Sequence, residues 1–126
     1  MKFSKDVGYI AIKYADAYST ITNLIKVIFL MNRRSEMTRD EFVRYYLEKH
    51  VPISKQLPGL RKYVVNGAFV RPGKEPTFDG ASELWFDTLD AYRQAFSSLQ
   101  GKLTSEDADK FIGKTTSLIV EEHVII

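Results

Sequence analysis

Hydrophobic and polar positions follow two different periods along the chain, and the shorter period predicts four strands. Residues 25–31 (IKVIFLM) form a nearly unbroken apolar run rich in β-branched side chains, which is typical of a strand buried on both faces. Residues 60–70, 81–86 and 116–126 predict the other three, and the last ends in an apolar His-Val-Ile-Ile sequence. Polar segments or stretches rich in Pro and Gly separate these strands.

The first segment with helical character begins at a capping box. The Thr38 hydroxyl is placed to accept a hydrogen bond from a free backbone N–H, and the Glu41 side chain reaches back to the cap. We expect this helix to end at about His50, because Pro52 disfavours helical geometry at the residue before it.

The second helix is expected to begin at residue 87 or 88 and to stop at Gly101. Its apolar stripe at helical spacing consists of Leu89, Tyr92, Phe96 and Leu99. A short helical turn is expected within residues 104–112, before the last strand.

The predicted order is β-α-β-β-α-β, which is the ferredoxin-like arrangement of an α+β protein. Two helices then cover one face of a four-stranded antiparallel sheet, and the first and last strands are apolar on both faces. A second copy of the chain covers the other face most simply, so we expect a homodimer with the two sheets face to face. Residues 1–23 have a weak helical stripe that also suits the start of a strand, and they are treated as an N-terminal extension to a domain at 24–126.

Composition narrows the function classes. The 126 residues carry a net charge of +2, which is too even to indicate nucleic acid or an anionic membrane as a partner. No apolar run approaches the roughly 20 residues that a membrane helix needs. The chain has no Cys and only two His, so a thiolate nucleophile is excluded and no metal site is expected. The expected compartment is the cytoplasm.

Several segments together resemble one known family. The first helix ends in YLEKHVP (46–52), LPGL (57–60) follows it, and DGASELWF (79–86) covers the third strand. With IKVIFLMNRR at the start and LIVEE near the end, the chain from about residue 24 to residue 122 resembles the EthD family of dimeric α+β barrel proteins.

The resemblance implies the fold and the homodimer, and it leaves the activity open. Related fungal proteins are assigned as dehydratases or decarboxylases of aromatic polyketides, and neighbouring barrel families include cofactor-independent isomerases, quinol-forming monooxygenases and haem-degrading enzymes. The founding member is encoded with a cytochrome P450 system. A fold shared by so many activities does not choose among them.

His50 is the principal candidate for chemistry. Phe42, Tyr46 and His50 follow one another at intervals of four residues, so they share one helix face. His50 is the ionisable group on this apolar face, and burial keeps an imidazole neutral and able to accept a proton. The alternative is a core histidine that donates to a nearby carbonyl. The predicted catalytic residues are His50, Tyr46 and Glu83.

Glu83 has two alternative environments. On the helix-covered face it is a buried carboxylate beside His50, with Asp79 as the other nearby acid. On the opposite face it pairs instead with a base such as Arg61 or Lys62.

Aromatic side chains from successive elements predict a cavity for a flat hydrophobic molecule. The expected substrate-binding residues are Phe42, Tyr63, Trp85, Tyr92 and Phe96. Each of them also suits ordinary core or interface packing. Asn66 projects opposite to Tyr63 on an ideal strand, Asp79-Gly80 is most simply a turn, and His123 is an edge or interface residue.

Two functions follow. The first is an enzyme without a bound cofactor that transfers protons on a small hydrophobic or aromatic molecule, as a dehydratase, decarboxylase or isomerase, with His50 as acid or base. The second is a non-catalytic dimeric module that binds such a ligand or supports an oxidoreductase system.

Overall fold

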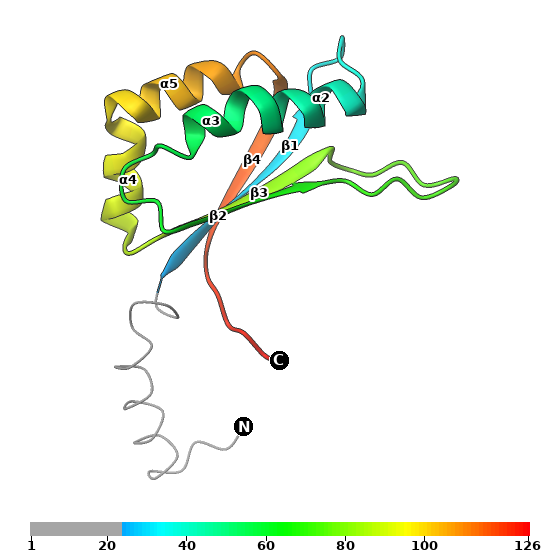
Figure 1. The fold of residues 1–126 in the computed structure, drawn as a ribbon. Coiled ribbons are helices and arrows are strands. Elements are labelled where there is room, and N and C mark those ends of the chain that lie inside the picture. The colour runs from blue at the N-terminus through cyan, green and yellow to red at the C-terminus, as the bar shows by residue number, and fades with distance from the viewer. Residues whose placement is uncertain (1–23) are drawn as a thin grey trace.

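A computed structural model describes residues 24–126 (Figure 1). The predicted N-terminal extension at residues 1–23 lies outside the described residues. In chain order the elements are β1 (Ile25–Arg33), α2 (Arg39–Tyr45), the π-helical turn η1 (Tyr46–His50), α3 (Val51–Ser54), β2 (Lys62–Gly67), β3 (Gly80–Phe86), α4 (Leu89–Ser97), α5 (Leu99–Ala108) and β4 (Ile112–Glu121).

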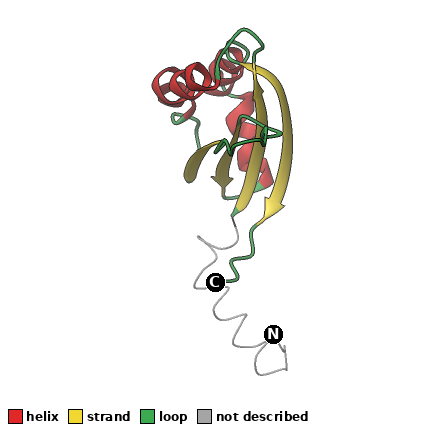
Figure 2. Cartoon of the chain, turned by 90° about the vertical axis from the view of Figure 1, so that its right-hand side faces the viewer, coloured by secondary structure: helices red, strands yellow, loops and turns green. Residues whose placement is uncertain are grey.

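The four strands form one antiparallel sheet in the order β2-β3-β1-β4. The helices lie together on one face of this sheet (Figure 2). This arrangement confirms the predicted ferredoxin-like α+β fold. Among the described residues no helix is long and apolar enough to cross a membrane.

The first helix starts as predicted and continues further than predicted. Thr38 accepts from the Glu41 N–H at 3.1 Å, and Glu41 accepts from the Thr38 N–H at 2.9 Å, which confirms the capping box. The expected end at His50 is wrong, because the backbone passes through η1 and continues as α3. Pro52 lies in the first turn of α3, a position at which proline is tolerated.

The second helical region consists of two helices rather than one. Ser98 adopts an extended backbone that ends α4, and its hydroxyl accepts from the Gly101 N–H at 3.1 Å to cap α5. Gly101 is therefore buried inside α5, and the prediction that it stops a helix is wrong. Leu99 is 74% exposed, so the apolar stripe ends at Phe96.

The core has two parts, both between the sheet and the helices. One is built from Val27, Leu57, Leu84, Phe86 and Ala95, under α4. The other is built from Met31, Phe42, Tyr46 and Phe111, under α2 and η1. The second part places Tyr46 in the layer where the candidate site lies.

The opposite face of the sheet carries a row of apolar side chains that no helix of residues 24–126 covers. Strand alternation places on it Ile28, Leu30, Val64, Leu118 and Val120. The prediction that the last strand spans residues 116–126 is wrong in its bounds, since β4 runs from Ile112 to Glu121. Most side chains of β4 are exposed. The apolar side chains of Val124 and Ile125 follow the strand in an exposed tail.

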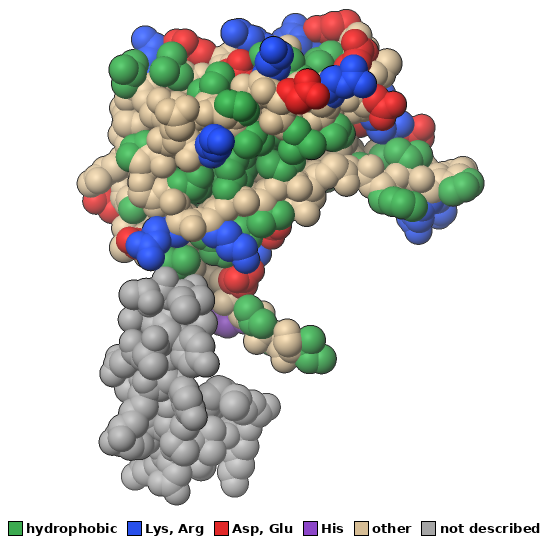
Figure 3. Space-filling model, in the orientation of Figure 1, with side chains coloured by type: hydrophobic (Ala, Val, Ile, Leu, Met, Phe, Trp, Pro, Cys, Tyr) green, Lys and Arg blue, Asp and Glu red, His purple; other side chains and the backbone are tan. Residues whose placement is uncertain are grey.

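Residues 68–79 form an arm that projects beyond the sheet, with hydrophobic and basic side chains on its surface (Figure 3). Phe69 is 85% exposed on this arm. At its base Asp79 is buried and accepts from the backbone N–H of Arg33 at 2.8 Å and from the guanidinium groups of Arg33 and Arg39. Gly80 belongs to β3, so the expected Asp79-Gly80 turn is wrong, and Asp79 joins the arm to β1 and α2.

Candidate functional site

His50 lies at the last position of the π turn and is 5% exposed. Its ring contacts Tyr46 in an edge-on arrangement, with 5.3 Å between ring centroids, and lies 4.9 Å from the ring of Phe111. A π turn forms i→i+5 hydrogen bonds, here from the Val51 N–H to the Tyr46 carbonyl, and such turns recur at functional sites. The turn thus presents Tyr46 and His50 together to the space above the sheet.

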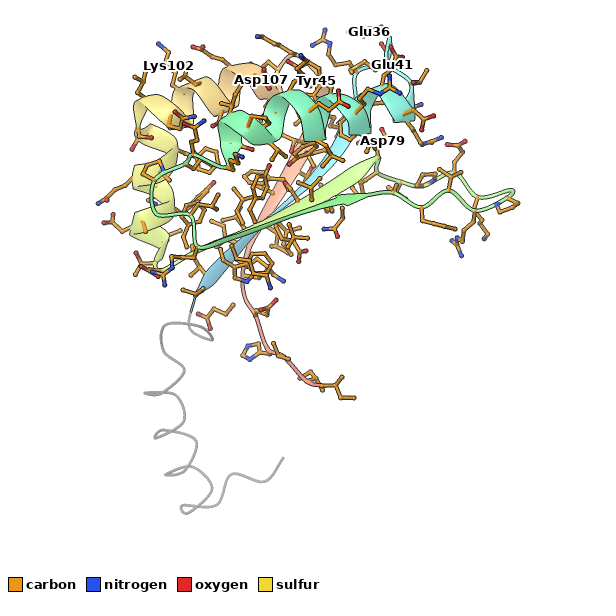
Figure 4. The ribbon with its side chains drawn as sticks, viewed as in Figure 1. Glu36, Glu41, Tyr45, Asp79, Lys102 and Asp107 are labelled. Carbon is orange, nitrogen blue, oxygen red and sulfur yellow. The ribbon has the colours of Figure 1, made fainter. Side chains whose placement is uncertain are left out.

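Asp107 of α5 fixes the orientation of the imidazole. Its Oδ2 lies 2.8 Å from His50 Nδ1, and its Oδ1 accepts from the Tyr45 hydroxyl at 2.8 Å. Tyr45 and Asp107 face one another across the two helices (Figure 4). A carboxylate at this distance makes Nδ1 the protonated nitrogen and leaves Nε2 as an acceptor when the ring is neutral.

The protonation states of these groups follow from burial. Burial lowers the pKa of His50 below its ordinary value, against the opposing effect of Asp107. Burial, together with the bond to Asp107, raises the pKa of Tyr45 to about 12, so Tyr45 stays a donor. The site therefore holds a neutral imidazole near pH 7.

Nε2 of His50 faces a cavity. None of the described residues forms a hydrogen bond with this nitrogen. Among the described residues every fully buried side-chain nitrogen or oxygen has a hydrogen-bond partner, so Nε2, which has none, is not fully buried. The cavity beside it has a volume of about 230 Å³. Its apolar lining consists of Phe29, Met31, Leu84, Phe96, Ala108 and Ile112.

Three hydroxyl groups on the cavity wall form a hydrogen-bonded chain. Ser54 donates to the Tyr63 oxygen at 2.8 Å, and Tyr63 donates to the Tyr46 oxygen at 3.1 Å. Burial raises the pKa of both tyrosines, so both keep their protons. Tyr46 thus stands between this chain and His50.

The structure gives the predicted site residues different positions. Four of them line the cavity: His50, Tyr46, Tyr63 and Phe96. The prediction that Tyr63 and Asn66 point in opposite directions is confirmed, since the Asn66 side chain donates to the Ala81 carbonyl and does not line the cavity. Phe42 is a core residue, 1% exposed, that does not line the cavity. Tyr92 packs between Phe86 and Phe96 in the first core. The predicted ligand contacts of Phe42 and Tyr92 are therefore wrong for this cavity.

Glu83 and Trp85 lie on the other face of the sheet. Glu83 accepts from Lys26 at 3.0 Å, which lowers the pKa of the carboxyl, and the Trp85 ring lies against the ammonium groups of Lys26 and Lys62. Glu83 is thus not the partner of His50, and Trp85 does not line the cavity. The predicted roles of both residues at this site are wrong, because the register of β3 turns Ser82 and Leu84 toward the helices.

Sequence reasoning missed Asp107 and Ser54. Asp107 shares one face of α5 with the buried residues Gly101 and Thr104, so a search for small and polar residues at helical spacing finds it. Ser54 was outside the expected helix.

His123 lies in the exposed tail after β4. Within residues 24–126 no group of three or more His, Asp or Glu side chains is arranged to hold a metal ion.

The fold and the cavity define a small ferredoxin-like protein with an imidazole–carboxylate pair above its sheet. The family model described as EthD domain matches residues 34–115. The chain belongs to the EthD family.

Known proteins agree with this assignment. An EthD family protein from Bacillus halodurans is 31% identical, with a TM-score of 0.69 over 79% of this chain and 99% of that one. The chain is 27% identical to an uncharacterized 11.0 kDa protein in the thcB-thcC intergenic region of Rhodococcus erythropolis, over 68% of this chain and 84% of the relative. A dimeric ferredoxin-like protein of unknown function from Thermobifida fusca shares the fold alone, at 15% identity and a TM-score of 0.63 over 79% of this chain and 91% of that one.

Proposed function

We propose that the protein is an enzyme that transfers protons on a small hydrophobic molecule, with His50 as the general base and no bound cofactor required. One observation carries this proposal: Nδ1 of His50 is held by Asp107, while Nε2 opens into an apolar cavity. A base must lie within hydrogen-bond reach of the proton that it removes, and this nitrogen is accessible to a molecule in the cavity.

Electrostatics support the base rather than the acid role at the start of a reaction. The imidazole is neutral near pH 7, because burial lowers its pKa. When Nε2 takes a proton, the ring becomes a cation, and the Asp107 carboxylate 2.8 Å away stabilises it. The same pair can return the proton to a different atom, as an isomerase, a dehydratase or a decarboxylase requires.

The test uses a general-base probe that needs no knowledge of the natural substrate. Nitrobenzisoxazole is a neutral two-ring compound whose ring opens when a base removes its carbon-bound proton and the N–O bond breaks. We expect the protein to accelerate this reaction and His50→Ala to lose about 10²–10⁴-fold of the rate. Appearance of the coloured phenolate gives the rate.

His123→Ala is the matched control, because His123 is the other histidine and lies in the exposed tail. It should retain the full rate. Equal rates for His50→Ala and the wild-type protein contradict the proposal. Tight binding of the probe with no acceleration supports instead the second candidate, a non-catalytic ligand-binding module that assists an oxidoreductase.

We further propose that the working form is a homodimer with the two sheets face to face. The apolar row Ile28, Leu30, Val64, Leu118 and Val120 supports this, because an uncovered apolar sheet face is a typical interface. The dimeric state described for the Thermobifida fusca protein of the same fold is in accord. The domain at residues 24–126 is then the unit that dimerises.

A further inference from the structure

We propose that the cavity selects an uncharged carbonyl compound of one or two rings, whose oxygen accepts a hydrogen bond from Tyr46 while a neighbouring carbon faces His50. This inference rests on the proposed function and names its substrate class. Four features of the described residues support it: the count of hydroxyl protons, the charge of the lining, the volume, and the position of Tyr46 beside His50.

The count of hydroxyl protons leaves one donor for a ligand. Each hydroxyl group has a single proton. Ser54 uses its proton on Tyr63, and Tyr63 uses its proton on Tyr46. The Ser82 hydroxyl, which lines the same cavity, also bonds to the Tyr46 oxygen, and this bond acts to lower the pKa of Tyr46, as a donated hydrogen bond does. With Tyr63 and Ser82 both donating to this buried oxygen, the Tyr46 proton is left for a carbonyl oxygen in the cavity.

The charge of the lining excludes anionic ligands. Among the described residues that line the cavity there is no Lys or Arg, and the one carboxylate is that of Asp109, an exposed residue. A carboxylate or phosphate group entering this space would lose its hydration without gaining a cation. The negative charge of Asp109 in the lining would also repel it. A neutral molecule meets neither cost.

The volume limits the size of the ligand. Drug-sized ligands occupy pockets of roughly 300–1,000 Å³. This cavity has about 230 Å³, which suits one or two rings and not a larger fused system. The apolar side chains of the lining suit the ring carbons, and the hydroxyl chain supplies polar contacts.

The position of Tyr46 gives the donor a chemical role. The Tyr46 and His50 rings contact one another, with 5.3 Å between their centroids, and both side chains line the cavity, so a carbonyl compound bound at Tyr46 shares its space with His50. In the proposed complex the carbon next to the carbonyl faces Nε2. Nε2 takes a proton from that carbon, the C–H electron pair forms the C=C bond of an enolate, and the charge collects on the oxygen held by Tyr46. Return of the proton completes the exchange or places it on another carbon, with no oxidant or reductant consumed.

The test compares three two-ring probes on the full chain. β-Tetralone is a neutral ketone, β-naphthoate is an anion of similar size, and tetralin is the ketone's hydrocarbon counterpart. We expect β-tetralone to bind at least about tenfold more tightly than β-naphthoate. Tyr46→Phe should weaken β-tetralone by about fivefold to tenfold, the range of one hydrogen bond, and leave tetralin unchanged. Tyr92→Phe, which alters a tyrosine outside the cavity, is the matched control.

Each outcome decides the proposal. Failure of β-tetralone to bind, or tighter binding of β-naphthoate, overturns it. Equal weakening of β-tetralone and tetralin by Tyr46→Phe also overturns it, because the substitution then acts through shape alone. Deuterium exchange into β-tetralone separates this inference from the proposed function. If β-tetralone binds selectively and His50→Ala leaves the rate of exchange unchanged, the ligand class is supported and the general-base role is overturned.

Discussion

Asp107 Oδ2 lies 2.8 Å from His50 Nδ1, although 57 positions separate the two residues in the chain. Two different helical segments, η1 and α5, therefore have to pack correctly before the imidazole acquires its orientation. The pair connects the fold directly to the chemistry that we propose.

Replacing Asp107 by Asn should slow the nitrobenzisoxazole reaction, because an amide no longer fixes the tautomer of His50. We expect a loss that lies within the about 10²–10⁴-fold range of general-base catalysis. Asp107 raises the pKa of His50 against burial, so its removal should also move the acid limb of the pH–rate profile to lower pH. A residue with only a structural role would leave that limb in place. Glu106→Gln, which alters a 58% exposed carboxylate of the same helix outside the cavity, is the control.

His50 should make the protein less stable as the pH falls. Its pKa is lowered in the folded state, so below about pH 6.5 the unfolded chain binds a proton that the folded chain does not. The free energy of unfolding then decreases by up to about 1.4 kcal/mol per pH unit until the folded pKa is reached. Urea titrations of wild-type protein and His50→Gln at several pH values measure the difference. His123→Gln should follow the wild-type curve, and parallel curves for His50→Gln and wild type contradict the expectation.

Gly101→Ala should destabilise the protein, although alanine favours helices over glycine by about 1 kcal/mol. An added Cβ would lie 2.4 Å from the Ala95 carbonyl oxygen and 2.5 Å from the Phe96 backbone. We expect a net loss of about 1–3 kcal/mol, measured by thermal or urea unfolding. Gly67→Ala is the control, because its Cβ meets only Val43 at an ordinary 3.5 Å. A more stable Gly101→Ala variant would show that α4 and α5 separate easily.

Asp79→Asn should loosen the base of the projecting arm. The buried carboxylate accepts from Arg33 and Arg39, and the neutral amide cannot replace it for both cations. The expected loss in unfolding free energy is about 1–3 kcal/mol. Glu75→Gln removes an 81% exposed carboxylate that also pairs with Arg39, and it should change stability by less than about 1 kcal/mol. Similar losses for the two variants would argue against a special role for the buried group.

Leu118→Lys should convert the proposed dimer to monomers, because it places a charge in the apolar row of the open sheet face. Leu118 is 58% exposed in the single chain, so the substitution has little to disturb within it. Sedimentation velocity measures the change in mass. Leu99→Lys alters an equally large leucine, 74% exposed on α5, and should remain dimeric. A monomeric wild-type protein would refute the dimer.

Local sequence patterns predicted most helices and strands, whereas the positions of the site residues depend on long-range contacts. The capping box of Thr38 and Glu41 depends on neighbouring residues, and the sequence shows it directly. Strand alternation puts Glu83 and Trp85 on the same face of a strand, as the structure has them, but the register with β1 determines which face that is. Asp107 meets His50 only through helix packing, so no local pattern in the sequence joins them.

The same contrast explains the errors at the helices. Glycine commonly ends helices, and only the packing of α5 against the end of α4 shows that Gly101 is required for close approach. The regular α-helical period cannot predict a π turn, because the turn departs from that period over a single segment. Sequence reasoning therefore placed Tyr46 and His50 on one face correctly and ended the helix too early.

The π turn at Tyr46–His50 also has a consequence for comparing relatives residue by residue. A π turn contains one residue more than the α-helical turn that it replaces. A relative with an uninterrupted α-helix here should therefore align with a one-residue gap before Val51. Deletion of one residue inside the turn would keep the helix but rotate His50 away from Asp107. A gap at this point in an alignment therefore marks relatives that have lost the His50–Asp107 pair.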